Sequence, residues 1–174
     1  MEDTTPLVRY NPRKSAYTFG LEIEFALATM PESGIDPEPY ISGTISNMPD
    51  HQSARNALRE TLKSVGISAE APDLSVPPLP SHRQSWILKD DVTIRAPDRA
   101  YSWIAIELCS PALYFTPGSL EQVRIVLETL AKTYRINCNR SCGLHVHVGN
   151  ALRGFSVQTI RKLMATICKL QPPL

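Results

Sequence analysis

Apolar and polar residues alternate with a period of two in residues 17–28, 101–109 and 142–149. Successive side chains of a β-strand point to opposite faces of a sheet, so this alternation predicts strands with one apolar and one polar face. The last of these strands is expected at residues 144–148, and a further strand is predicted at residues 86–94, with a turn at Lys89–Asp91 as the alternative. We therefore expect a sheet of at least four strands.

Apolar residues recur at helical spacing in three other segments, residues 51–65, 119–134 and 156–170. Such spacing predicts amphipathic helices that pack one face against a core. Gly66 is the expected end of the first helix, and Ser119 is the expected N-cap of the second. The order of elements predicts an α+β fold, in which helices pack on one face of a largely antiparallel sheet.

Composition indicates one ordinary globular domain. The chain has 174 residues, 43% of them hydrophobic, and a net charge of +1. This charge gives no reason to expect nucleic acid or a membrane surface as a partner, and the longest apolar runs are far shorter than a membrane span. The acidic start at Met1–Asp3 is neither a secretory signal nor a transit peptide, so we expect a cytoplasmic location.

Proline marks the expected loops. Most of the fifteen prolines lie in residues 31–50 and 71–82, which predicts loops at residues 29–50 and 71–82. Residues 1–16 are expected to form a loose N-terminal arm, which leaves residues 17–174 as the folded domain.

Candidate chemistry lies inside the predicted strands. Glu22 and Glu24 would stand about 6–7 Å apart on one face of the first strand. Paired carboxylates of this kind suit hard divalent cations such as magnesium, manganese or calcium. Glu107, His145 and His147 occupy the polar faces of two further strands. A sheet that aligns the strands would collect these side chains on one acidic, imidazole-bearing face.

Other readings of these residues stay open. Glu22 and Glu24 alone would also fit a half-exposed strand whose acids are solvated. Glu107 lies in an otherwise apolar strand, and a buried acid needs a partner, which would be an Arg or Lys side chain or a metal ion. A zinc-binding domain is a separate alternative because the chain contains the pattern Cys-x3-Cys-x2-His-x-His. Its ligands would be Cys138, Cys142, His145 and His147.

Four motifs in order resemble the amidoligase family, a branch of the carboxylate–amine ligase superfamily that includes glutamine synthetase and glutamate–cysteine ligase. They are Phe-Gly-Leu-Glu-Ile-Glu-Phe at 19–25, Trp86 through Asp91-Val-Thr93, Ile-Glu-Leu-Cys-Ser-Pro at 106–111 and Cys-Gly-Leu-His-Val-His-Val-Gly at 142–149. The resemblance implies a fold like the catalytic domain of glutamine synthetase. The chain would hold the N-terminal portion of that domain.

The resemblance also implies roles for single residues. Glu22, Glu24 and Glu107 are similar to the acids that hold the catalytic Mg²⁺ or Mn²⁺ ions, together with the metal-ligating His145. The implied nucleotide-binding residues are His147, Asp91 and Gly20.

The chemistry implied by the resemblance is ATP-dependent. A carboxylate attacks the γ-phosphate, and an amine displaces phosphate from the resulting acyl phosphate to form an amide. The acid and the amine would be small molecules or peptides. The family's arginine-containing later half has no match after Gly149. We therefore expect a chain that is inactive alone or completed by a second chain, with a non-catalytic interaction module as the alternative function.

Overall fold

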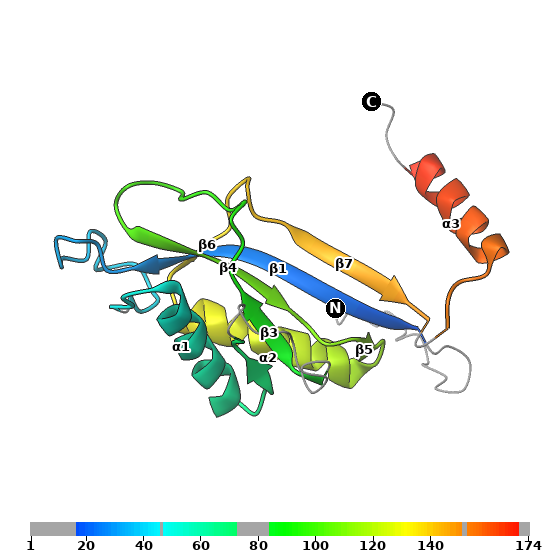
Figure 1. The fold of residues 1–174 in the computed structure, drawn as a ribbon, viewed down its shortest axis with the longest axis horizontal. Coiled ribbons are helices and arrows are strands. Elements are labelled where there is room, and N and C mark those ends of the chain that lie inside the picture. The colour runs from blue at the N-terminus through cyan, green and yellow to red at the C-terminus, as the bar shows by residue number, and fades with distance from the viewer. Residues whose placement is uncertain (1–16, 46, 73–83, 151–152, 171–174) are drawn as a thin grey trace, which may run out of the picture.

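A computed structural model of the protein describes residues 17–45, 47–72, 84–150 and 153–170 (Figure 1). These residues form an α+β fold, as predicted, in which seven strands make one mostly antiparallel sheet. The predicted arm at residues 1–16 and most of the loop at 71–82 lie outside the described residues. The elements in chain order are β1 Thr18–Thr29, α1 His51–Ser64, β2 Ala69–Glu70, β3 Trp86–Lys89, β4 Ser102–Cys109, β5 Leu113–Tyr114, α2 Pro117–Thr133, β6 Ile136–Asn137, β7 Leu144–Gly149 and α3 Val157–Leu170.

Strand β1 is the centre of the sheet. Both β4 and β5 pair with one edge of β1, and β6 and β7 pair with its other edge, all of them antiparallel. Beyond β4 follow β3, which is antiparallel to it, and β2, which is parallel to β3. This order places the polar residues of β1 between those of β4 and β7.

The two faces of the sheet differ because the alternation predicted from the sequence is real. Helices α1 and α2 lie on one face, below the sheet in Figure 1. The fully buried core on this side includes Leu27, Leu58, Leu88, Ile106 and Val126. The opposite face carries the polar residues of the same strands, so the helices cover the core and leave the candidate site open.

Local sequence explains where the helices begin. Asp50 caps α1, because its carboxylate accepts a hydrogen bond of 2.7 Å from the backbone N–H of Ser53. The N-cap of α2 is Thr116, whose hydroxyl accepts a bond from the N–H of Ser119. The prediction that Ser119 itself is the cap is therefore wrong, because Pro117 is compatible with the first turn of a helix.

The strand predictions need two corrections. Strand β3 ends at Lys89, so residues 86–94 are not one strand, and the alternative in which the chain turns after Lys89 is the one that the structure supports. The two-residue strands β2, β5 and β6 were not predicted, because two residues are too few to show a period.

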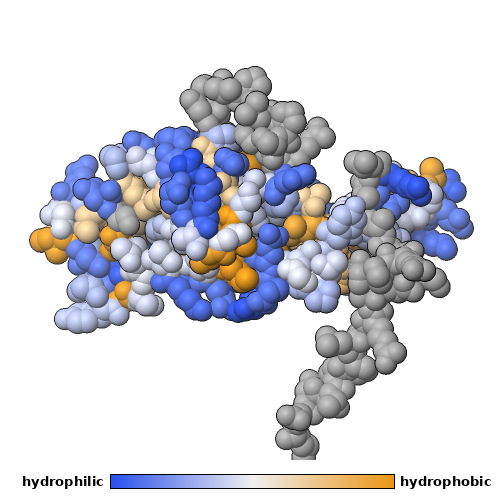
Figure 2. All heavy atoms as spheres, turned by 90° about the horizontal axis from the view of Figure 1, so that it is seen from below, coloured by the Kyte–Doolittle hydropathy of each residue, from blue (hydrophilic) through white to orange (hydrophobic). Residues whose placement is uncertain are grey.

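Helix α3 departs from the predicted packing. The expectation that all helices pack on one face holds for α1 and α2, whereas α3 has no buried residue and stands away from the sheet in Figure 1. Apolar surface is also visible near the middle of the face seen from below (Figure 2). Within the described residues, no helix combines the length and apolar character that crossing a membrane requires.

Candidate functional site

The register of three strands brings the predicted site residues together. Glu24 of β1 lies opposite Glu107 of β4, and Glu22 of β1 lies opposite His145 of β7. His147 lies opposite Gly20, one strand period further along. Because cross-strand neighbours share a face, the five predicted acids and imidazoles line one side of the sheet.

Glu22 is the centre of this cluster. One carboxylate oxygen lies 3.0 Å from His145 Nδ1, and the other lies 3.2 Å from His147 Nε2. Hydrogen bonds with His145 and His147 hold the pKa of Glu22 below its ordinary value. The bond to Glu22 in turn raises the pKa of His145 above 6.5, against a smaller opposing effect of desolvation. The pair thus favours a carboxylate beside an imidazolium when no metal is bound.

The loop that precedes β7 positions the carboxylate of Glu24. Its carboxylate accepts a hydrogen bond of 2.7 Å from the backbone N–H of Gly143, and its other oxygen lies 3.7 Å from His145 Nδ1. A Cβ at residue 143 would lie 3.0 Å from His145 Nε2 and 3.2 Å from the Glu24 carboxylate. The absence of a side chain at Gly143 is therefore what lets both groups approach.

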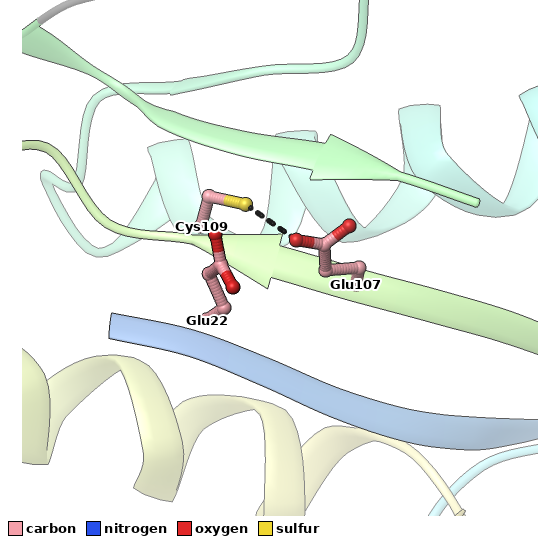
Figure 3. Close-up of side chains that lie close together, drawn as sticks. All are labelled: Glu22, Glu107 and Cys109. Atoms are coloured by element: carbon pink, nitrogen blue, oxygen red, sulfur yellow. Dashed lines mark hydrogen bonds between the residues drawn. The ribbon is translucent and has the colours of Figure 1, made fainter. Parts of the chain in front are cut away.

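Glu107 has the basic partner that an acid in an apolar strand requires. Lys89 Nζ of β3 lies 3.5 Å from the Glu107 carboxylate, and the Cys109 thiol donates a hydrogen bond of 3.1 Å to the same oxygen (Figure 3). Burial lowers the pKa of Lys89, but its contacts with Cys109 and Glu107 outweigh burial and leave the pKa raised. Burial and the bond to Glu107 raise the pKa of Cys109 to about 11.

The donor set fits a hard divalent cation better than zinc. Ligand atoms of Glu22, Glu107 and Cys109 all lie within 4.8 Å of one another, although Cys109 is a protonated thiol and thus a poor ligand near neutral pH. Carboxylate oxygens with an imidazole nearby are ligands for magnesium or manganese. Among the described residues, neither Cys138 nor Cys142 belongs to a group of three or more side chains that could hold one metal ion. The geometry therefore gives no support to the zinc alternative.

A pocket of about 400 Å³ adjoins this cluster. Its walls include Gly20, Glu22, Cys109, Ser110 and His147. A Cβ at Gly20 would lie 3.9 Å from its nearest neighbours, which is ordinary contact. The pocket places His147 and Gly20 beside Glu22.

Within the described residues, Asp91 forms no hydrogen bond or ion pair with the other residues of the site. Its carboxylate accepts hydrogen bonds from the N–H and the hydroxyl of Thr93, at 2.8 and 2.7 Å, and these bonds lower its pKa. The nearby charge of His145 lowers it further. In this structure Asp91 stabilises its own turn.

Sequence reasoning did not assign three of the groups that hold the site. Cys109 shares the strand face of Glu107, so the alternation contained a signal for it. Lys89 and the N–H of Gly143 gave no such signal, because their contacts depend on which strands pair and in which register.

Comparison with known proteins identifies the family. Residues 15–174 match the family described as putative amidoligase enzyme. The chain belongs to this family. No curated protein and no solved structure matches the chain. Membership in the amidoligase family points to a ligase-like function, and it covers every residue of the cluster described above.

Proposed function

We propose that the polar sheet face of this amidoligase-family chain binds ATP with Mg²⁺ or Mn²⁺ and serves the ligation of a carboxylate to an amine. The observation that carries the proposal is the convergence of Glu22, Glu24 and Glu107 with His145 on one open face beside a pocket. An antiparallel sheet commonly leaves one face to solvent, so the gathered acids and imidazole, rather than the open face, support the proposal.

The metal ligands in this proposal are Glu22, Glu24, Glu107 and His145. A bound Mg²⁺ or Mn²⁺ would neutralise the charge of the triphosphate and polarise the phosphoryl group that is transferred. The chain's own groups keep the ligands in place, because the N–H of Gly143 orients Glu24 and Lys89 forms an ion pair with Glu107. Metal binding requires a neutral His145, so it displaces the proton that Glu22 otherwise stabilises.

Nucleotide phosphates would lie in the adjoining pocket. His147 and the open backbone at Gly20 line it, and both adjoin Glu22. Asp91 stays a proposed nucleotide-binding residue, because it lies near enough to His145 for the charge of that ring to affect its pKa. The acid and amine substrates, small molecules or peptides, would approach from the same open face.

The proposed reaction has two steps. A substrate carboxylate attacks the γ-phosphate of ATP, which gives an acyl phosphate and ADP. The amine then attacks the acyl carbon, releases phosphate and loses a proton as the amide forms. Enzymes accelerate such phosphoryl transfers mainly by positioning the reactants and stabilising the developing charge, because the protein has little covalent chemistry to perform.

The supply of positive charge sets the expected rate. Among the described residues, Lys89 is the only Lys or Arg that forms an ion pair with the three acids, and it is directed to Glu107. Phosphoryl transfer needs cationic groups on the transferring phosphate besides the metal ions. We therefore propose that this chain alone binds nucleotide weakly and ligates slowly, and that cationic groups from outside the described residues or from a second chain complete the site.

Release of phosphate from ATP tests the proposed activity. The purified chain is incubated with ATP, Mg²⁺ and a mixed pool of amino acids, and any turnover is expected to be slow and to disappear in Glu22→Gln and His145→Ala. The matched control is Glu121→Gln, which removes the same charge from the exposed surface of α2. Turnover that is equally fast in Glu22→Gln and in the unchanged chain would contradict the assignment of the site.

A further inference from the structure

A second pocket, of about 560 Å³, lies between two loops of the chain. One loop follows β3 and contributes Thr93 and Arg95, and the other precedes β7 and contributes Arg140 and Ser141. Figure 1 shows both loops above the sheet, on the side opposite α1 and α2. The arginine pocket, which is lined by Thr93, residues 95–97 and residues 139–141, therefore lies on the same side of the sheet as the acids.

Hydrogen bonds between the two loops fix the frame of the arginine pocket. The backbone N–H of Arg95 donates a bond of 2.8 Å to the hydroxyl of Ser141, and the carbonyl of Arg95 accepts a bond of 2.8 Å from the side-chain amide of Asn139. The side-chain oxygen of Asn139 in turn accepts bonds from the N–H and the hydroxyl of Ser141. Asn139 and Ser141 thus hold the two loops together around the pocket.

Arg95 and Arg140 give the pocket its charge. Both residues are exposed, and neither guanidinium forms an ion pair with another described residue. Among the described residues that line the pocket, none is Asp or Glu. Guanidinium groups bind carboxylate and phosphate oxygens through paired N–H donors, so two of them in one pocket favour an anionic ligand.

The position of the arginine pocket indicates which anion it binds. The loop that carries Arg140 continues to Gly143, whose N–H donates to the carboxylate of Glu24. The pocket proposed for the nucleotide phosphates adjoins Gly20, which lies on β1 about 13 Å before Glu24. The two pockets thus lie at opposite ends of the acid cluster. With the nucleotide at one end, the other end remains for the acid substrate.

We propose that the arginine pocket binds the second carboxylate of a dicarboxylic acid whose first carboxylate reaches the metal ligands. This inference rests on the proposed function and names the class of its acid substrate. A monocarboxylic acid would leave both arginines without an anion, so the pocket selects the diacid. The two arginines act on the substrate rather than on the transferring phosphate, so they do not replace the cations that phosphoryl transfer requires.

A matched pair of acids tests the pocket. Glutarate and pentanoate have the same chain length, and only glutarate carries a second carboxylate. NMR titration of the chain in the presence of Mg²⁺ is expected to show glutarate bound at least about tenfold more tightly than pentanoate, because charge-assisted hydrogen bonds hold the second carboxylate. Equal affinity for the two acids would overturn the proposal.

Substitution of the arginines assigns this preference to the pocket. Arg95→Gln and Arg140→Gln are each expected to weaken glutarate binding by about tenfold and to leave pentanoate binding unchanged. The loops stay joined in Arg95→Gln, because the bonds that join them use only backbone atoms of residue 95. The control is Arg161→Gln, an exposed substitution on α3 that is expected to change neither affinity. Glutarate binding that is unaffected by both pocket substitutions would contradict the assignment.

Protection of the arginines from phenylglyoxal, measured by mass spectrometry, identifies the source of the anion. Glutarate is expected to slow the modification of Arg95 and Arg140 but not that of Arg161, because only an unoccupied pocket reacts. Protection of both pocket arginines by ATP with Mg²⁺, and not by glutarate, would assign the pocket to nucleotide phosphate and overturn the proposal.

Binding of Mn²⁺ with ATP by the unchanged chain tests the proposed function separately. Protection by glutarate in a chain that does not bind Mn²⁺ with ATP would uphold the arginine pocket and contradict the metal site. Binding of Mn²⁺ with ATP in a chain whose pocket arginines glutarate does not protect would overturn the arginine pocket alone.

Discussion

At the scale of single residues, the strand period was enough to place the acids and imidazoles on one face. Phe19, Leu21 and Ile23 alternate with Gly20 and Glu22, so the two sets lie on opposite faces of β1. The contacts within the cluster could not be derived in the same way, because they depend on the register between strands that are far apart in sequence.

The pair of Glu22 and His145 has a defined dependence on pH. The pKa of His145 is raised, so its contribution to stability is present below 6.5 and is lost as pH rises through the folded value. The pKa of Glu22 is lowered, so its contribution is present above 4.5 and is lost as pH falls through the folded value. Without metal, the pair therefore stabilises the fold most between these two limits.

NMR titration of the His145 ring checks this assignment. Its pKa is expected above the ordinary value of 6.5 in the metal-free chain, and to fall in Glu22→Gln, where the carboxylate charge is lost. Glu121→Gln, remote from the ring on α2, is expected to leave it unchanged. A pKa of His145 that does not respond to Glu22→Gln would show that the pair is not formed in solution.

At the scale of elements, the segment before α1 is fastened to the strand that follows α2. Arg135 is buried, and its guanidinium donates hydrogen bonds of 2.8 Å to Asp36, 2.6 Å to the hydroxyl of Tyr101 and 2.7 Å to the carbonyl of Ile41. Proline content correctly predicted a loop in this segment, but it could not predict that the loop contacts Arg135. The attachment depends on long-range contacts of this arginine and on the backbone hydrogen bond from Thr44 N–H to the carbonyl of Thr133.

Gly43 is the expected weak point of this attachment. Its φ is +100°, and a Cβ there would lie 2.8 Å from backbone atoms of Tyr134 and Arg135. Gly43→Ala is therefore expected to lower the melting temperature by several degrees. Gly34→Ala is the matched control, since Gly34 also has a positive φ, +68°, but no atom within 4 Å of the added Cβ. Equal losses in both variants would mean that backbone strain alone, and not close packing, governs Gly43.

At the scale of the whole molecule, the α+β class and the shared face of the site were predictable, whereas the packing of the last elements was not. Periodicity identified α3 correctly as an amphipathic helix at residues 157–170. Periodicity only says that a helix has an apolar face, and it cannot say what covers that face. The exposed stripe of α3 became visible only in the structure.

Binding of Mn²⁺ is the most direct measurement of the central claim that this face holds a divalent metal with nucleotide. Electron paramagnetic resonance of free Mn²⁺, titrated with the chain in the presence of ATP, is expected to show binding beyond that of ATP alone. Glu22→Gln and Glu107→Gln are each expected to weaken this binding by about tenfold or more, because each removes one charged ligand. The control Glu121→Gln is expected to bind as the unchanged chain does. Binding that is absent from the unchanged chain, or equal in all four proteins, would contradict the account.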